Sequence, residues 1–171
     1  MELLDIYDSK GKLTGKTIER GGDLSKLKED EHIAVGVIFI ENDKGEYLIQ
    51  KTSKEKGGEF SSTGGHIDSN ETPLSSIKRE VEEELGIIVN EKEIKEYGYL
   101  LYDMPLRFLF YIKKNIDLKD VKVQKEEVDY VEYMSVEKIK ELIKTNQMLK
   151  SHAIMFEELL KKKKRKVIWN R

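Results

Sequence analysis

One short segment constrains this chain more than any other: residues 65–87 read GHIDSNETPLSSIKREVEEELGI. Thr72 is a candidate N-cap, and Pro73 suits the first turn of a helix. Gly86 suits the left-handed position just after a last turn. Gly64 and Gly65, just before, allow the backbone to approach a neighbour closely or to adopt positive φ. The segment predicts a loop, a helix over 73–85 and a second loop.

The predicted helix carries an acidic face beside an apolar face. Successive residues turn by about 100°, so Glu80, Glu83 and Glu84 share one stripe. Like charges at this spacing destabilise an ordinary helix by about 0.2–0.5 kcal/mol per pair, and a bound divalent cation would reverse that sign. Hard oxygen ligands favour Mg²⁺ or Mn²⁺. The alternative is a solvated acidic face in a chain that is 37% charged.

The complete pattern is G-x5-E-x7-R-E-U-x-E-E-x-G-U, where U is aliphatic, and it resembles the Nudix box at every fixed position. This resemblance implies a hydrolase that cleaves the diphosphate linkage of a nucleoside diphosphate linked to another moiety. It also implies an α+β fold: a Nudix-like α/β/α sandwich, with a mixed β-sheet between helices and the box as a loop–helix–loop catalytic motif. From the order of its predicted elements alone, the chain suggests an α+β fold or a three-layer sandwich.

The resemblance also implies roles for individual residues. The metal ligands would be Glu80, Glu83, Glu84 and the carbonyl of Gly65, with Arg79 orienting the glutamates and with Gly64, Glu71 and Gly86 structural in the motif. The metal would neutralise the diphosphate and activate water, and a carboxylate would take the proton. That base is either Glu80 or Glu127, because many relatives carry a Glu-Val pair before a late strand. A plain surface charge is the equal alternative for Glu127.

Residues outside the acidic face would bind the rest of the substrate. Lys51 and Arg107 are candidates for phosphate, and His66 lies inside the metal loop. Aromatic side chains that could stack on a base are Tyr99, Tyr102 and Phe110, for which core packing or a solvated surface is an equal reading. The sequence does not choose among nucleoside triphosphates, nucleotide sugars, ADP-ribose and dinucleoside polyphosphates.

A second resemblance points to the Nudix branch similar to isopentenyl-diphosphate isomerase. It rests on Asp5-Ile6-Tyr7-Asp8, Gly11, Gly15, the strand begun by His32, and Leu48-Ile49-Gln50-Lys51. His32 and His66 fall where that isomerase has metal-binding histidines, but its cysteine position holds Gly64 and this chain has no cysteine. We therefore favour hydrolysis over isomerisation. A non-catalytic nucleotide-binding module is a further alternative, against which the intact box argues.

Composition and chain length bound the remaining expectations. The 171 residues predict a single domain over 1–171, with an N-terminal hairpin and loop over about 1–30, a core over 31–147 and a C-terminal helix and tail over 148–171. A net charge of −2 gives no reason to expect nucleic-acid or anionic-membrane binding. We see no membrane span and no signal peptide, so we expect a cytoplasmic protein. Family members are often dimers, so a homodimer is an open option.

Periodicity predicts the other elements. Strands are expected at 3–7, 13–18, 32–40, 46–50, 94–102, 106–112 and 128–133, and helices after Ser135 and over 152–162. The basic run at 161–166, KKKKRK, is either a localisation or phosphate patch or, as we favour, a solvated helix end.

Overall fold

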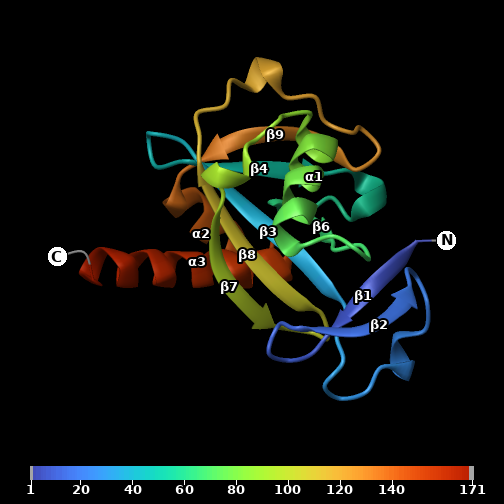
Figure 1. Ribbon diagram of the computed structural model, residues 1–171. Helices are drawn as coiled ribbons and strands as arrows, with labels where there is room; N and C mark the ends of the chain where they lie inside the picture. The colour runs from blue at the N-terminus through green and yellow to red at the C-terminus, as the bar shows by residue number, and fades with distance from the viewer. Residues whose placement is uncertain (1, 170–171) are drawn as a thin grey trace.

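The computed structural model describes the backbone of residues 2–169 and the side chains of residues 2–165 (Figure 1). Strands precede and follow a first helix, and two further helices come last along the chain. The strands are β1 (Leu3–Tyr7), β2 (Leu13–Glu19), β3 (Ala34–Glu41), β4 (Tyr47–Thr52), β5 (Phe60–Ser61), β6 (Thr63–His66), β7 (Lys95–Leu101), β8 (Leu106–Lys113) and β9 (Val128–Met134). The helices are α1 (Pro73–Leu85), α2 (Val136–Lys144) and α3 (Lys150–Trp169), with short 3-10 turns at Leu24–Lys26, Lys54–Lys56, Glu91–Glu93 and Leu118–Asp120.

A mixed sheet of seven strands forms the centre of the molecule. Its main path runs β5-β4-β3-β8-β7, with β6 paired to β3 and β9 paired to β4. β3 and β8 are parallel over their whole length, from Ala34 opposite Leu106 to Glu41 opposite Lys113. The other pairs in this sheet are antiparallel. This arrangement confirms the expected α+β class with a mixed sheet between helices.

The two faces of this sheet bury separate apolar clusters. On one face, α1 inserts Ile77, Val81 and Leu85 against side chains of β3 and β8 such as Ile38 and Phe110. On the other face, α2 and α3 pack against the same strands (Figure 1), in a cluster that includes Phe39, Tyr47, Leu109, Met155 and Phe156. Because side chains alternate along a strand, β3 supplies both clusters, which explains its nearly continuous apolar sequence.

The N-terminal hairpin β1–β2 forms its own two-stranded sheet and packs beside the loop that leads into α1 (Figure 1). Leu4 bridges to Asp68, and Tyr7 bridges to His32. Asp5 accepts hydrogen bonds from the Ser69 hydroxyl and the Asn70 amide, at 2.8 and 3.1 Å. The hairpin therefore holds the loop between β6 and α1 in place.

Most expected elements are present, with shifted ends. The strand expected from His32 begins at Ala34, and the last helix begins at Lys150 and reaches Trp169. The short strand β6, which includes two glycines, is not expected from the sequence, because its extended conformation depends on pairing with β3. Within the described residues, no helix is long and apolar enough to span a membrane.

The basic run near the C-terminus is partly integrated into the fold. The Lys162 ammonium donates to the Tyr97 carbonyl. Lys163 pairs with Glu41 at 2.6 Å and lies 4.6 Å from the centre of the Tyr111 ring. Only part of this run is therefore the solvated helix end that we favoured; the side chain of Lys166 lies outside the described residues.

Candidate active site

Helix α1 has the ends that its sequence predicts. Thr72 accepts a hydrogen bond from the Ser75 amide, and the Ser75 hydroxyl accepts one from the Thr72 amide, so the two residues form a reciprocal capping box. Gly86 ends the helix with φ of 67°, and its amide donates to the Glu82 carbonyl. These caps fix the rotation and the length of α1, and they orient its acidic face toward β6.

Gly64 and Gly65 bring strand β6 unusually close to its neighbours. A Cβ atom at Gly65 would lie 2.3 Å from Glu80 Oε1, and one at Gly64 would lie 2.4 Å from the Gly36 carbonyl oxygen. Neither glycine has positive φ. The sequence suggested either close approach to a neighbour or positive φ for these glycines, and the structure shows close approach. The Glu80 carboxylate lies directly against the backbone of β6.

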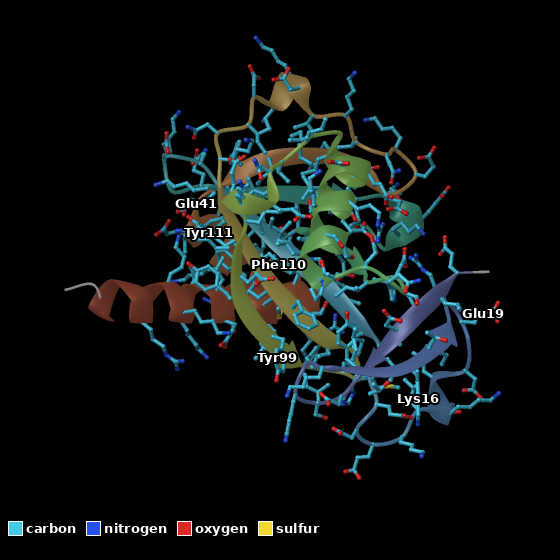
Figure 2. All side chains as sticks on the ribbon, in the orientation of Figure 1. Lys16, Glu19, Glu41, Tyr99, Phe110 and Tyr111 are labelled. Atoms are coloured by element: carbon cyan, nitrogen blue, oxygen red, sulfur yellow. The ribbon has the colours of Figure 1, made fainter. Side chains whose placement is uncertain are left out.

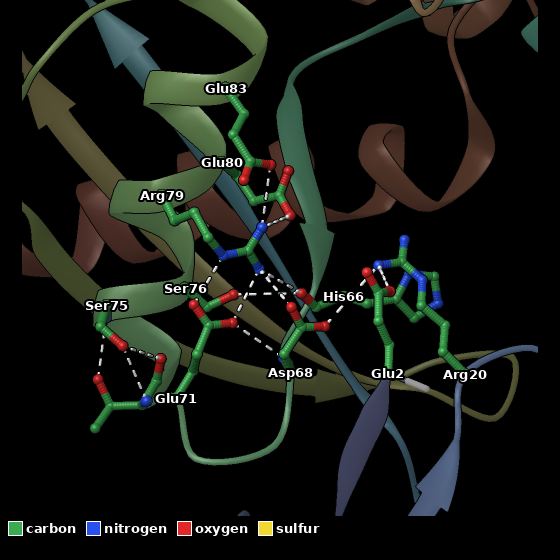
Figure 3. Close-up of polar contacts among 11 residues, drawn as sticks. Glu2, Arg20, His66, Asp68, Glu71, Ser75, Ser76, Arg79, Glu80 and Glu83 are labelled. Atoms are coloured by element: carbon green, nitrogen blue, oxygen red, sulfur yellow. Dashed lines mark hydrogen bonds and ion pairs between the residues drawn. The ribbon is translucent and has the colours of Figure 1, made fainter.

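Arg79 is the centre of a network of carboxylates (Figure 3). It forms a bidentate pair with Glu71, with Nε–Oε2 and Nη2–Oε1 distances of 2.8 and 2.9 Å. Its Nη1 donates to Glu80 at 3.0 Å and to Glu83 at 3.1 Å. Its Nη2 also lies 3.4 Å from Asp68 Oδ2. One guanidinium therefore contacts four carboxylates, which leaves an excess of negative charge at this face of α1.

The three glutamates of the acidic face differ sharply in exposure. Glu80 and Glu84 are buried, whereas the side chain of Glu83 is 48% exposed. Burial raises the pKa of Glu80 to about 7, against the lowering effect of the Arg79 charge. Burial also raises the pKa of Glu84 to about 8, although a hydrogen bond from Gln50 at 3.1 Å opposes this rise. At both carboxylates, burial therefore outweighs the charges and hydrogen bonds that lower the pKa.

Glu127 lies in the loop before β9 and is brought toward the same face. Its carbonyl accepts a hydrogen bond from the Ser53 amide at 2.9 Å, which ties this loop to the end of β4. The side chain of Glu127 is exposed. Burial raises the pKa of Glu84 most, the charge of Glu80 raises it further, and the charge of Glu127 makes a smaller contribution in the same direction. The structure therefore brings both base candidates, Glu80 and Glu127, near Glu84.

His66 of β6 and Arg107 of β8 lie on two strands that both pair with β3, each opposite Val35. The His66 carbonyl accepts from Arg79 Nη2 and from the Ser76 hydroxyl, both at 3.3 Å. Burial, followed by the charges of Arg20 and Arg107, lowers the pKa of the His66 ring. Arg107 is half-buried, donates to the Tyr102 carbonyl at 3.1 Å, and lies over the Tyr102 ring. The lowered pKa favours the neutral form of the His66 ring.

Other residues singled out from the sequence have different surroundings. The Lys51 ammonium donates to the Gly58 carbonyl and lies 4.5 Å from the centre of the Phe60 ring. Phe110 is a core residue, 1% exposed, and Tyr99 packs on Phe108. Both ring nitrogens of His32 are engaged, by the Ser9 hydroxyl and the Met104 carbonyl. None of these contacts joins the residue to the Arg79 network.

The donor set at this face fits a hard divalent cation, although among the described residues no three acidic or histidine side chains already converge as a metal cluster. Every nearby donor is a carboxylate or a carbonyl oxygen, which is the ligand chemistry of Mg²⁺ and Mn²⁺. Two of the carboxylates are buried with raised pKa values, and a cation would stabilise their charged forms. The missing Cβ of Gly65 leaves backbone directly beside Glu80.

Sequence reasoning did not identify three residues that belong to the surroundings of this site. They are Arg20, Gln50 and Asp68. Gln50 holds Glu84, and Asp68 and Arg20 extend the Arg79 network. Only Asp68 had a local signal, because it lies in the loop between Gly65 and Glu71; the others come from distant parts of the chain.

The chain and its fold are similar to known proteins of one family. The NUDIX domain profile matches residues 30–158. An uncharacterized Nudix hydrolase of Listeria monocytogenes is 31% identical over 154 residues, covering 87% of this chain and 89% of that protein. The ADP-ribose pyrophosphatase of Methanocaldococcus jannaschii is 34% identical over 85 residues, covering 49% of this chain and 50% of that protein. A Deinococcus radiodurans crystal structure matches with a TM-score of 0.70 and 18% identity, covering 86% of this chain and 91% of that one.

Proposed function

This chain belongs to the Nudix hydrolase family. We propose that it hydrolyses the diphosphate linkage of a nucleoside diphosphate joined to another moiety, a reaction of the kind named for its relative, the ADP-ribose pyrophosphatase. The single observation that carries this proposal is the acidic face of α1. Glu80 lies against the Gly65 backbone, Arg79 links Glu80 to Glu83, and Gln50 holds Glu84. Such an arrangement suits a cation and the phosphates that accompany it.

Nudix hydrolases need divalent metal ions, and we assign this requirement to Mg²⁺ or Mn²⁺ held by Glu80, Glu83, Glu84 and the Gly65 carbonyl. When bound, such an ion would neutralise phosphate charge and lower the pKa of an attacking water. Arg79 would keep Glu80 and Glu83 turned toward the substrate through the hydrogen bonds it already makes. Glu71, paired with Arg79 and with the Asp68 amide, would keep the loop rigid.

A carboxylate must accept the proton of the attacking water while the P–O bond of the bridge breaks. Glu80 and Glu127 are the two candidates. Glu80 is buried beside the Gly65 backbone and is held by Arg79, so its position is fixed. Glu127 is exposed in the loop before β9, and its charge acts on Glu84. Comparing Glu80→Gln with Glu127→Gln in single-turnover kinetics separates the two roles.

The edge of the site beside His66 is the proposed phosphate-binding region. Arg107 makes one hydrogen bond through Nε, so its other donors are available to a phosphate oxygen. The neutral His66 ring offers a further hydrogen bond without adding charge. Lys51 is a weaker candidate, because its ammonium is already bonded to the Gly58 carbonyl. The base or other moiety of the substrate is left unassigned.

The finer resemblance, to the branch similar to isopentenyl-diphosphate isomerase, stays a prediction. The N-terminal residues on which it rests form the hairpin β1–β2 beside the box loop. Isomerisation itself is disfavoured, because the chain has no cysteine and both ring nitrogens of His32 are engaged. The single-domain organisation, the cytoplasmic location and a homodimer also stay predictions.

A substrate panel tests the proposed function. Nucleoside triphosphates, nucleotide sugars, ADP-ribose, dinucleoside polyphosphates and isoprenoid diphosphates would each be incubated with Mg²⁺, with Mn²⁺ and with chelator, beside Glu84→Gln. We expect turnover of a nucleotide member that requires metal and is lost in the variant. Activity that persists in chelator, or in Glu84→Gln, would contradict the metal assignment. A folded protein that turns over no member would indicate a binding module.

A further inference from the structure

Arg20 brings a positive charge from the N-terminal hairpin to the edge of the site. It directly follows strand β2, outside the 30–158 region that the family profile matches. Its amide donates to the Glu2 carbonyl at 2.9 Å, so the backbone is held at the end of the hairpin. From there the side chain reaches over Asp68 toward His66 (Figure 3).

The guanidinium of Arg20 is only weakly engaged by the protein. Its recorded polar contacts all involve Nη1, which donates to Glu2 Oε2 at 3.2 Å and lies 3.9 Å from Asp68 Oδ1. The second distance is too long for a hydrogen bond, and within the described residues Asp68 Oδ1 is buried without a hydrogen-bond partner. The Arg20 side chain is 44% exposed. Nε and Nη2 can therefore serve a ligand without breaking a strong contact.

Arg79 cannot supply these donors, although it is closer to the acidic face. Its Nε, Nη1 and Nη2 all donate to carboxylates or to the His66 carbonyl. A phosphate that approached Arg79 would have to displace a carboxylate. Among the described residues, Arg20 and Arg107 differ from Arg79 in keeping free donors. The side chain of Arg20 reaches toward His66 (Figure 3), and Arg107 and His66 both lie opposite Val35 of β3, so the two arginines lie near the same histidine.

We infer that Arg20 is a substrate-binding residue: it leaves Glu2 to bind a phosphate group of the diphosphate substrate near His66. This inference rests on the proposed function. A guanidinium presents a planar pair of N–H groups that matches two phosphate oxygens. Asp68 keeps its contact with Arg79 at 3.4 Å when Arg20 turns away. The hairpin β1–β2 is then part of the active site as well as a brace for its loop.

Three variants test this inference: Arg20→Gln, Glu2→Gln and Lys16→Gln. Lys16 is the matched control, since it lies on the same hairpin and pairs with Glu31 at 2.7 Å, away from the site (Figure 2). For the best substrate of the panel we expect Arg20→Gln to raise KM about tenfold, with kcat changed by less than about threefold. Glu2→Gln and Lys16→Gln should match the wild type. If Arg20 only stabilised the hairpin through its pair with Glu2, Glu2→Gln would raise KM as much as Arg20→Gln.

A binding measurement separates this inference from the proposed function. Calorimetry with methylenediphosphonate and Mg²⁺ needs no turnover, and Arg20→Gln should weaken binding about tenfold. Unchanged KM and affinity in Arg20→Gln, beside an active wild type, would reject the role of Arg20 alone. Arg20-dependent binding by a wild type that hydrolyses nothing would reject the proposed hydrolysis alone. A wild type that neither binds nor hydrolyses would reject both.

Discussion

Two half-buried cations lie on opposite faces of the central sheet, and they differ in how many carboxylates contact them. Arg79 on α1 and Lys163 on α3 have nearly equal side-chain exposure, 29% and 28%. Arg79 contacts four carboxylates, whereas Lys163 contacts one, that of Glu41, together with the Tyr47 hydroxyl and the Tyr111 ring. Glu41 and Tyr111 lie near α3 (Figure 2).

The difference between these two clusters is a difference in charge balance. Around Lys163, one cation meets one anion, and the Tyr111 hydroxyl donates to the same carboxylate, so every group is satisfied within the protein. Around Arg79 the anions outnumber the cation, and two nearby carboxylates have raised pKa values. A balanced buried pair serves the fold. An unbalanced one indicates that a ligand of opposite charge completes the site.

The strongest test of this comparison uses neighbouring glutamates on α1. Glu83→Gln removes a proposed metal ligand, and we expect a loss of roughly 10³-fold or more in kcat/KM. Glu82 has a similar exposure, 39%, but pairs with Lys78 on another side of the helix. Glu82→Gln should therefore keep activity within about twofold. Steady-state kinetics on both variants, with circular dichroism to check folding, gives the result; equal losses would refute the assignment.

Replacing the unbalanced cation should affect both activity and stability. Arg79→Lys loses the bidentate contact with Glu71 and cannot reach Glu80 and Glu83 at once. We expect kcat/KM to fall about 10²-fold and the free energy of unfolding to fall by about 1–3 kcal/mol. Kinetics and urea denaturation measure the two effects. A variant with full activity would mean that Arg79 does not orient the glutamates.

Replacing the balanced cation should affect stability alone. Lys163→Met leaves Glu41 without its cation, and we expect the free energy of unfolding to fall by about 1–3 kcal/mol with kcat/KM unchanged. The double variant Glu41→Gln, Lys163→Met should recover part of that loss, because no unpaired charge is left. Urea denaturation of the set gives the comparison. A loss of activity in a folded Lys163→Met would break the distinction between the two clusters.

The last comparison is a pH dependence that arises at the unbalanced cluster. The pKa values of Glu80 and Glu84 are raised from 4.5 to about 7 and about 8, so near neutral pH the folded chain holds protons that the unfolded chain has released. In chelator, the free energy of unfolding should therefore fall by about 2 kcal/mol as the pH rises from 7 to 9. Added Mg²⁺, or Glu80→Gln with Glu84→Gln, should remove this fall in thermal melts.

Much of the fold was predictable because its signals are local. The caps Thr72 and Gly86, the apolar stripe of α1 and the paired strands β7 and β8 all follow from residues close in sequence. Strand β6 was not predictable, because two glycines have no intrinsic strand preference and only pairing with β3 makes them extended. The length of α3 was also missed, since its last turns follow a basic run that resembles a helix end.

The sequence by itself determined which chemistry the site carries: a spacing of three and four residues sets Glu80, Glu83 and Glu84 on one face, whatever surrounds the helix. Only the tertiary structure decided how those carboxylates differ. The close approach of Gly65 and the contact with Gln50 bury two of them and leave Glu83 exposed. The tertiary structure likewise brings Arg20 and Glu127, which are far apart in the sequence, to the site. Such contacts depend on the packing of the whole chain, so no local spacing encodes them.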